Sequence, residues 1–360
     1  MNVAFDARMI THPGIGRYIR SLLCALIATA RDSTFTLYGD PGSLRSFGQF
    51  GNCCLRKYNV PIYSLREALF NPLSRTATIV THVPNFNVPL HRPQKLVVTI
   101  HDLIYLKIPQ TRTFFKGVGA HFLIRRALEG AARIIAVSEN TRRDIVEFCP
   151  SVERKIRVVY EAAAPSFRKI THQGVLEGVK KKYNLPPKFI LFVGSLRRHK
   201  NIEGLLEAYI QLKKSRRVDI SLVITGRFHP PDRYIWDRIR STDAIYLGEV
   251  SHADLVALYN CAACFCNLSL YEGFGLTILE AQRCGLAVVC SNIAPHREVG
   301  GEGVCSVDPT NVDQIEESLY NVLTKIDYRD FLISKGLENA ERFSWTQAAE
   351  ATLNIYKELQ

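Results

Sequence analysis

The sequence predicts an α/β protein built from two doubly wound parallel sheets. Short apolar runs rich in β-branched residues alternate with longer amphipathic segments along all 360 residues, which is typical of parallel sheets covered by helices. This rhythm breaks in the Pro- and Gly-containing stretch from Ala162 to Pro187 and then restarts. A chain of this length favours two domains over one core. We therefore expect two Rossmann-like domains that face each other across a cleft and hold a ligand at the carboxyl ends of their strands.

In the first domain, runs of four or five residues that are largely apolar or β-branched predict six strands. They are Asn2 to Phe5, Thr34 to Tyr38, Thr78 to Thr81, Leu96 to Ile100, Arg133 to Val137 and Ile156 to Val159. Amphipathic segments predict helices over 17–29, 116–130 and 139–148, the last with Ser138 as its N-cap.

The second half repeats this order of elements. Strands are expected at 189–193, 221–225, 244–247, 263–267 and 287–291, and helices at 202–212, 252–259, 276–283, 312–323 and 328–360. The resulting domains are 1–170 and 188–343, joined by a linker over 171–187. A C-terminal helix over 344–360 is expected to return to the first domain.

The net charge of +12 is unevenly distributed along the chain. Residues 1–187 hold 27 Lys and Arg against 12 Asp and Glu, whereas residues 188–360 hold 19 against 22. Such asymmetry indicates an anionic partner of the first half, namely nucleic acid, a lipid surface or a phosphorylated substrate. The alternative is a solvated basic surface.

Targeting and metal signals are weak. No apolar run approaches the 18 or so residues that span a bilayer, and the chain opens directly into a strand pattern instead of a signal peptide. We therefore expect a cytoplasmic protein. The ten cysteines lie mostly in apolar runs such as Cys261 to Cys266, where burial in a strand is favoured over a metal or redox site.

The most informative run is NLSLYEGFGLTILEAQRCG, residues 267–285. It leaves an apolar strand, crosses a loop with Gly273 and Gly275, and enters a helix. Glycines in such a turn let backbone N–H groups approach a ligand, and a helix N-terminus favours phosphate. The amides of Gly275, Leu276 and Thr277 are therefore a candidate phosphate cradle; a simple tight turn is the alternative. Glu272 and Glu280 flank it, and their carboxylates suit the hydroxyls of a transferred sugar and of a ribose.

This arrangement of two glutamates around Gly-Phe-Gly resembles the signature of glycosyltransferase family 4, whose members are retaining enzymes of the GT-B fold that use nucleotide sugars. The resemblance continues through residues 269–309, and through FVGSLRRHKNIEGLLEAY from Phe192, LVITG from Leu222 and YLGEVSHADLVALY from Tyr246. The resemblance extends into the first half through HPGIGRY from His12, the pair His101-Asp102 and IIAVSENTRRDI from Ile134. Within the family, the chain looks most like bacterial mannosyltransferases of surface polysaccharide assembly.

The resemblance implies a donor site in the second domain. A basic pair after its first strand would clamp the diphosphate. Lys200 stands in the family's Lys position, but Ser195 replaces the usual Arg, so Arg197 or Arg198 would supply that charge. The alternative is an exposed basic loop. The backbone around Glu249 and Val250 would hold the base. Gly273, Phe274, Gly275, Leu276, Thr277 and Glu280 complete the donor-binding set, and Glu272 and Lys200 are the catalytic candidates.

In the first domain, the resemblance places three residues near the donor. Gly14 and Gly16 would form a flexible loop that approaches the diphosphate and the acceptor. They do not complete a dinucleotide-binding fingerprint, so a dehydrogenase is disfavoured. His101 follows the strand Leu96 to Ile100 and would contact the transferred sugar near its anomeric carbon. A structural histidine is the alternative reading.

The implied reaction moves a hexose, with mannose favoured, from GDP-mannose or a UDP-sugar to a glycan or lipid-linked saccharide. We expect front-face attack with retention, no metal and no cofactor. The alternatives are a nucleotide-sugar epimerase or phosphorylase on the same fold and, more remotely, a basic nucleic-acid-binding protein, which lacks support from interleaved exposed aromatics. In such enzymes the first domain receives the acceptor, so its basic charge suggests that it lies on the inner face of the cytoplasmic membrane.

Overall fold

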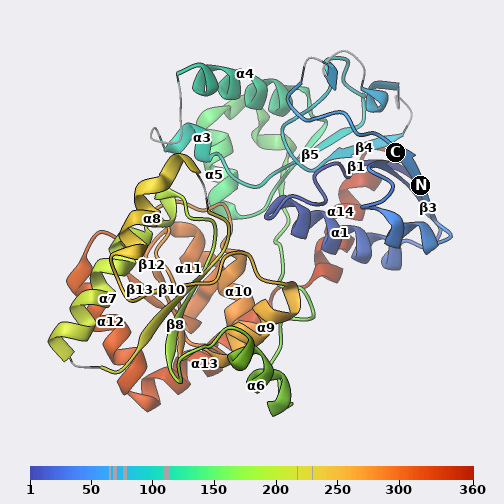
Figure 1. The fold of residues 1–360 in the computed structure, drawn as a ribbon. Coiled ribbons are helices and arrows are strands. Elements are labelled where there is room, and N and C mark those ends of the chain that lie inside the picture. Colours follow the sequence, from blue (N-terminus) through green and yellow to red (C-terminus); the bar gives the residue numbers. More distant parts are fainter. Residues whose placement is uncertain (65, 68–70, 76–78, 109–113, 217, 229) are drawn as a thin grey trace. The chain divides into compact units, whose positions relative to one another are not determined.

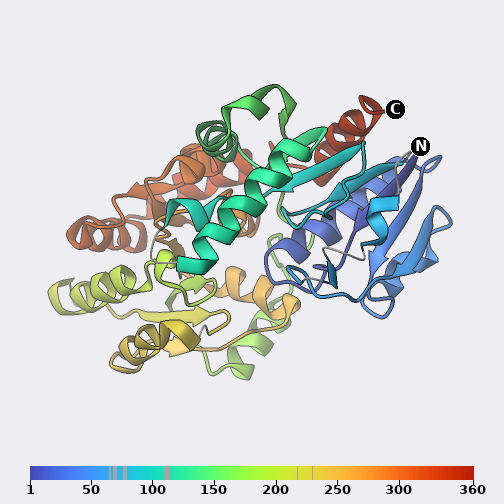
Figure 2. The ribbon, with the colours of Figure 1, turned by 90° about the horizontal axis from the view of Figure 1, so that it is seen from above.

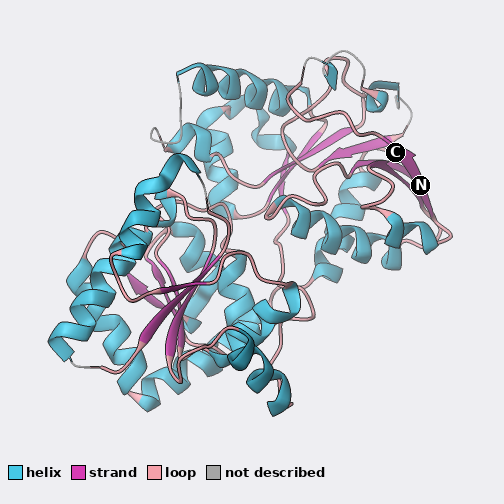
Figure 3. Ribbon diagram, in the orientation of Figure 1, coloured by secondary structure: helices cyan, strands magenta, loops and turns pink. Residues whose placement is uncertain are grey.

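The computed structural model describes residues 1–360 except 65, 68–70, 76–78, 109–113, 217 and 229. The chain divides into two compact units (Figure 1): unit 1 comprises Met1–Glu161 and Ser344–Gln360, and unit 2 comprises Ala162–Phe343. Each unit contains one all-parallel sheet with helices on both of its faces (Figure 3). This is the predicted pair of Rossmann-like domains.

The sheet of unit 1 has seven strands in the order β3-β2-β1-β4-β5-β6-β7. The strands are β1 Asn2–Asp6, β2 Thr34–Gly39, β3 Cys53–Lys57, β4 Val80–Val83, β5 Leu96–Ile100, β6 Arg133–Ala136 and β7 Ile156–Val158. The inner strand β5 is buried along its whole length, as expected for a strand covered on both faces. The strand order reverses between β1 and β4, so the loops that follow these two strands flank a topological switch point.

The helices of unit 1 are α1 Ile15–Thr29, α3 Ile104–Lys107, α4 Phe114–Gly130, α5 Glu139–Phe148 and α14 Trp345–Lys357. Ser138 caps α5 as predicted, because its hydroxyl accepts a hydrogen bond from the Thr141 amide at 2.9 Å. Helix α14 packs on α1, so the chain does return to its first domain after completing the second. Figure 2 shows α4 in unit 1 as a long single helix, and it contacts β5.

A buried hydrogen-bond chain attaches α14 to the sheet of unit 1. The Tyr356 hydroxyl contacts Nδ1 of His82 on β4, and Nε2 of that ring lies 2.8 Å from the Thr99 hydroxyl on β5. Burial lowers the pKa of His82 to about 3, so the ring is neutral and can accept one bond while donating the other. A helix near residue 350 is therefore an integral part of a core built largely before residue 160.

The sheet of unit 2 has six strands in the order β10-β9-β8-β11-β12-β13. They are β8 Phe189–Val193, β9 Ser221–Thr225, β10 Ile245–Tyr246, β11 Cys264–Asn267, β12 Val288–Ser291 and β13 Cys305–Val307. The helices are α6 Gln173–Lys182, α7 Ile202–Arg216, α8 Arg233–Arg240, α9 His252–Cys261, α10 Leu276–Arg283, α11 Ala294–Gly300, α12 Val312–Thr324 and α13 Ile326–Ala340. Here the order reverses between β8 and β11.

Several sequence predictions need correction. The predicted linker over 171–187 contains α6, which packs on α9 within unit 2. The predicted helical stretch over 328–360 consists of two helices, α13 and α14, and unit 1 resumes at Ser344, where the separate C-terminal helix was predicted to begin. Strands β3 and β13 were not expected; β3 is a sheet edge whose last two residues, Arg56 and Lys57, are exposed, so it lacks a buried strand's apolar pattern. The predicted strand start at Thr78 lies outside the described residues.

The charge asymmetry is smaller between the structural units than between the sequence halves. Unit 1 holds 23 Lys and Arg against 13 Asp and Glu, and unit 2 holds 23 against 21. The difference arises because residues 162–187, with five basic side chains and one acidic one, belong to unit 2. Unit 1 nevertheless carries most of the excess positive charge. Among the described residues, no helix is both long enough and apolar enough to cross a membrane.

Candidate active site

The candidate site of unit 2 lies at its topological switch point, where the loops after β8 and β11 leave neighbouring strands. The first loop ends in a short 3₁₀ turn, Arg198–Lys200, and the second carries Glu272. The Lys200 ammonium forms an ion pair with Oε1 of Glu272, and only 19% and 17% of the two side chains are exposed. The structure therefore brings together two of the three predicted catalytic residues.

The Glu272 carboxylate is held in its ionised form. Burial alone would raise its pKa, but the charges of Lys200 and His296 and the hydrogen bond from Lys200 outweigh burial and lower the pKa to about 2. The Ser269 hydroxyl donates a second hydrogen bond to Oε1 at 2.8 Å. Glu272 is thus an oriented acceptor at neutral pH, and a carboxylate so stabilised is a weak nucleophile.

The N-terminus of α10 follows directly. Gly275 is its N-cap with φ +103°, a left-handed conformation that favours glycine, and no side chain caps the helix. The first-turn amides of a helix lack intrahelical acceptors, and α10 has no acidic residue in that turn. The side-chain amide of Asn267 donates a hydrogen bond to the Thr277 hydroxyl at 3.1 Å, and this bond connects the first turn of α10 to the end of β11. This geometry suits an anion, as the sequence predicted for Leu276 and Thr277.

The side chains of two other predicted donor-binding residues, Phe274 and Glu280, are buried. The Phe274 ring packs edge-on against Phe343, with ring centroids 5.9 Å apart, so any donor contact of Phe274 would involve its backbone. Glu280 is only 1% exposed, and its Oε2 accepts a hydrogen bond from the Tyr259 hydroxyl at 3.0 Å. The sequence did not point to Tyr259, which lies 21 residues earlier on α9.

His296 on α11 is a site residue that sequence reasoning missed. Its ring is fully buried, and it acts on the pKa of Glu272. It also lies against the N-cap of α10: a Cβ placed on Gly275 would meet Cδ2 and Nε2 of His296 at 3.2 and 3.6 Å. The available signal was a polar residue shortly after the predicted strand 287–291, at the edge of the sheet where Glu272 also lies.

The remaining predicted donor residues lie around the same edge. Arg197 and Arg198 are exposed, and the charge of Arg198 acts on the pKa of Tyr234 on α8. Ser195 and Val250 are half-buried. The turn before Val250 is fixed at Gly248, whose carbonyl accepts hydrogen bonds from the Gly226 amide at 2.9 Å and the Thr225 hydroxyl at 2.7 Å. Which arginine faces a diphosphate stays a prediction.

In unit 1, His101 follows β5 as predicted and has a partner that the sequence did not reveal. Its Nδ1 lies 2.9 Å from a carboxylate oxygen of Glu161, and its Nε2 lies 3.2 Å from the Pro84 carbonyl oxygen after β4. The Tyr18 ring packs edge-on against the imidazole at 4.7 Å. Both ring nitrogens thus face acceptors, which fixes the plane of the ring. A sugar contact by His101 stays a prediction.

The predicted glycine loop of unit 1 is partly wrong. Gly14 is exposed and precedes α1, but Gly16 lies within the first turn of α1 and is buried. A Cβ on Gly16 would approach the Ile10 carbonyl oxygen to 2.3 Å. Close packing of α1 on the preceding loop, instead of loop flexibility, therefore requires this glycine.

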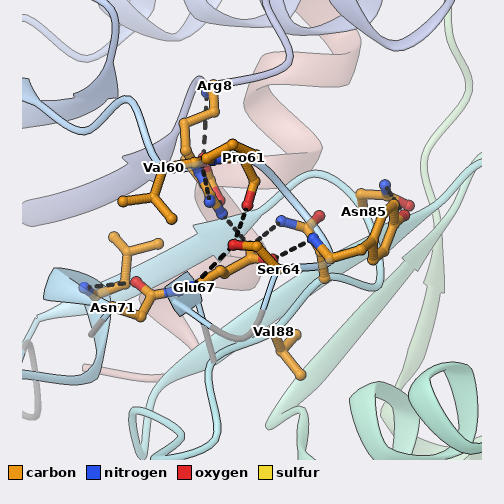
Figure 4. A network of polar contacts seen from close by, with 12 residues as sticks. Arg8, Val60, Pro61, Ser64, Glu67, Asn71, Asn85 and Val88 are labelled. Carbon is orange, nitrogen blue, oxygen red and sulfur yellow. Dashed lines mark hydrogen bonds and ion pairs between the residues drawn. The ribbon is translucent and has the colours of Figure 1, made fainter. Parts of the chain in front are cut away.

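A second polar network supports the loops after β1 and β4 (Figure 4). The Arg8 guanidinium pairs with Asp6 and Glu67, donates to the Val60 carbonyl at 3.1 Å and stacks on the Tyr58 ring at 4.1 Å. Asn87 donates to the same Glu67 at 2.9 Å. This network holds the segment near Val60 against the carboxyl end of β1, which is where unit 1 would meet a ligand.

Two protein-family models match the chain. The model for glycosyl transferases group 1 matches residues 177–338, and the model for Glycosyltransferase Family 4 matches residues 14–166. Together the two models match most of the chain, which therefore belongs to the glycosyltransferases that they describe. The two matched segments follow the two structural units, with Lys200, Glu272, Glu280 and His296 in the first-named match and His101 in the other.

Curated proteins that are similar to this chain include mannosyltransferases. O-antigen chain mannosyltransferase B of Escherichia coli is 29% identical over 99% of this chain and 100% of its own length. Serotype-specific mannosyltransferase WbdA of E. coli is 30% identical over 77% of this chain, which spans 34% of that longer protein. These relatives agree with the family match, and the names of both describe mannosyltransferases.

Solved structures show the fold. Sucrose-phosphate synthase of Thermosynechococcus elongatus has a TM-score of 0.76 at 18% identity, over 100% of this chain and 99% of that one. Anabaena HepE, solved in complex with UDP and glucose, has a TM-score of 0.76 at 16% identity, over 99% and 100%. The glycosyltransferase therefore has the GT-B fold predicted from its sequence.

Proposed function

We propose that this glycosyltransferase transfers mannose from GDP-mannose to a saccharide acceptor during assembly of a bacterial surface polysaccharide, with retention of anomeric configuration. The observation that carries the proposal is the ion pair between Lys200 and Glu272. Glu272 lies three residues before Gly275, the N-cap of α10, where no side chain caps the helix. A cation, an oriented carboxylate and free helix amides are what a sugar diphosphate needs. The choice of mannose rests on the names of the E. coli relatives.

The proposed chemistry follows from charge development. Departure of the nucleoside diphosphate places negative charge on its terminal phosphate and positive charge on the sugar ring. Lys200 and the N-terminus of α10 would stabilise the phosphate, and Glu272 would accept hydrogen bonds from the sugar. Because the Glu272 carboxylate is already engaged by Lys200 and Ser269, we propose that the acceptor hydroxyl attacks from the leaving-group face and gives its proton to the departing phosphate.

Glu280 would bind the ribose diol in this scheme. A carboxylate accepts hydrogen bonds from two adjacent hydroxyls, and the Tyr259 hydroxyl fixes its Oε2 position. The proposed mechanism uses neither a metal nor a bound cofactor. Trapping of a covalent glycosyl-enzyme adduct would contradict the front-face mechanism.

The first experiment is a calorimetric screen of GDP, UDP and ADP, followed by GDP-mannose turnover with mannose-terminated oligosaccharides as acceptors. We expect GDP to bind most tightly. Tighter binding of UDP would overturn the donor assignment, and failure of all three would overturn the site. Incubation with GDP-mannose alone separates the alternatives, because an epimerase converts its substrate without acceptor whereas a transferase shows only slow hydrolysis.

We also propose that unit 1 lies on anionic lipid, where a lipid-linked acceptor would be found. Support comes from its charge, because unit 1 has 23 basic and 13 acidic residues, whereas unit 2 has 23 and 21. Lys and Arg near an anionic surface contribute about 1 kcal/mol each to binding at moderate salt. The alternative is an evenly solvated basic surface.

A further inference from the structure

His296 is a buried imidazole with one ring nitrogen satisfied by the protein and the other not. Its Nδ1 lies 3.2 Å from the Ser291 carbonyl oxygen at the end of β12, and a carbonyl only accepts, so Nδ1 carries the proton. Nε2 is buried and has no hydrogen-bond partner among the described residues. In the neutral ring, Nε2 is therefore an unsatisfied acceptor.

An unsatisfied buried acceptor lowers the stability of the fold unless a hydrogen-bond donor reaches it. A buried polar atom without a partner destabilises a fold by an amount comparable to a lost hydrogen bond, and native structures contain few of them. An apolar side chain of similar size would fill the same space without that cost. The position of His296 thus points to a ligand that approaches Nε2.

The surroundings of Nε2 identify the class of that ligand. It lies 3.6 Å from the point where a Cβ of Gly275 would stand, so the absence of a side chain at the N-cap of α10 leaves the ring next to the helix N-terminus. The charged groups that act on the ring are Glu272, from the loop after β11, and Lys200, from the loop after β8. These are the residues of the proposed donor site, and a helix N-terminus attracts anions.

We propose that His296 is a ligand of the donor's diphosphate: Nε2 takes a proton from solvent as the nucleotide binds at the N-terminus of α10, and then donates a hydrogen bond to a phosphate oxygen. The inference rests on the proposed donor site and adds to it a titrating group. It assigns to the enzyme a second cation, formed only on binding, beside the permanent charge of Lys200.

The resting charge of the site is consistent with such a switch. Burial and the charge of Lys200 lower the pKa of His296 and outweigh Glu272 and the hydrogen bond to Ser291, which raise it, so that the pKa lies at about 4. The ring is therefore neutral at pH 7 before binding. Phosphate charges a few ångströms away, in surroundings less polar than water, favour the imidazolium and raise its pKa. Proton uptake occurs wherever the solution pH lies between the free and bound pKa values.

Calorimetry in buffers of different ionisation enthalpy tests this directly. The titrants are GDP-mannose and UDP-glucose, whose phosphates are all esterified and do not themselves titrate near neutral pH. For the nucleotide sugar that binds, we expect uptake of up to one proton per site at pH 7, increasing toward pH 6. The wild-type measurement requires no variant and so does not depend on the folding of one.

Variants assign the proton to His296. Asn keeps an N–H donor that does not titrate, so His296→Asn should bind without proton uptake and with a severalfold loss of affinity. His296→Leu should lose at least tenfold. Arg297→Ala, which removes an exposed charge from the same helix, should keep the wild-type proton count and affinity.

The outcomes separate the inference from the function beneath it. Binding of neither nucleotide sugar contradicts the donor site and, with it, the role of His296. Binding without proton uptake overturns only the role of His296. Loss of affinity for GDP-mannose but not for GDP in His296→Leu, again without uptake, would mean that Nε2 accepts from a sugar hydroxyl and would also overturn the phosphate contact.

Discussion

His101 in unit 1 and His296 in unit 2 both follow a strand of a parallel sheet, yet their hydrogen bonding differs. Both nitrogens of His101 face protein acceptors, the Glu161 carboxylate and the Pro84 carbonyl. His296 uses one nitrogen on the Ser291 carbonyl and leaves the other unpartnered. The protein alone orients the first ring, whereas the second keeps one ring nitrogen available for the ligand that we propose. Unit 2 therefore carries the stronger structural sign of a binding site.

Removal of Lys200 should have the largest effect. Lys200→Ala deletes the cation beside the leaving phosphate and leaves Glu272 buried without its partner, so kcat/KM should fall about 100- to 1000-fold. Lys188→Ala removes an exposed lysine of the same unit and should have little effect. Steady-state kinetics with GDP-mannose measure both, and wild-type values for Lys200→Ala would remove the site from unit 2.

Glu280 should matter mainly for donor affinity. Glu280→Ala removes the proposed ribose acceptor, and a hydrogen bond to a charged group is worth about 1.5–3 kcal/mol, so GDP affinity should fall about 10- to 100-fold. Tyr259→Phe removes only the hydroxyl that orients the carboxylate and should cost severalfold. Calorimetric GDP titrations compare the two. A larger loss in Tyr259→Phe than in Glu280→Ala would contradict the ribose assignment.

His101 should affect turnover and not nucleotide binding, which sharpens the contrast with His296. His101→Ala is expected to lower kcat about 10- to 100-fold while GDP affinity stays unchanged. Glu161→Gln keeps a hydrogen-bond acceptor for the ring and should lower kcat less, because Glu161 acts only by positioning His101. Loss of GDP affinity in His101→Ala equal to its loss of kcat would remove the distinction between the two histidines.

The buried histidines also predict an acid dependence of stability. His82 and His296 have folded pKa values lowered to about 3 and about 4, against 6.5 when exposed. Between pH 6.5 and 4 the unfolded chain therefore binds more protons, and the free energy of unfolding falls as pH falls, by up to about 1.4 kcal/mol per pH unit and histidine.

Urea unfolding at pH 6.5, 5.5 and 4.5 measures this dependence. His296→Asn should flatten the dependence for unit 2 and leave that of unit 1, which contains His82, unchanged. A slope unaltered by His296→Asn would show that the ring of His296 is not held neutral in the folded protein.

The smallest expected effect concerns the surface charge of unit 1. Binding to vesicles with anionic lipid should fall between low and physiological salt, because the screening length of exposed charges shortens from about 30 Å at 0.01 M salt to about 8 Å at 0.15 M. Neutral vesicles serve as the control. Equal binding to both vesicle types, or none to either, would return the charge to the solvated-surface interpretation.

Much of this could be predicted because local pattern and tertiary role coincide. The inner strands are apolar runs, and the loop from Glu272 to Gly275 combines two glycines and a carboxylate within four residues. His296 lacks such a pattern, since its meaning arises from its approach to Gly275, 21 residues earlier. Glu161 is likewise 60 residues from His101. Helix α6 was missed because its glycines and lysines suggest a linker, although Val179 is buried.

The path of α14 has a consequence for how the chain acquires its structure during synthesis. Unit 2 is continuous and can fold as soon as residue 343 has emerged, but unit 1 lacks the helix that covers α1 until residues 344–360 follow. Until then, the nascent enzyme exposes the apolar face that Leu353 and Tyr356 later cover. The domain synthesised first is therefore the one completed last, and shortening the chain before α14 should produce protein prone to aggregation.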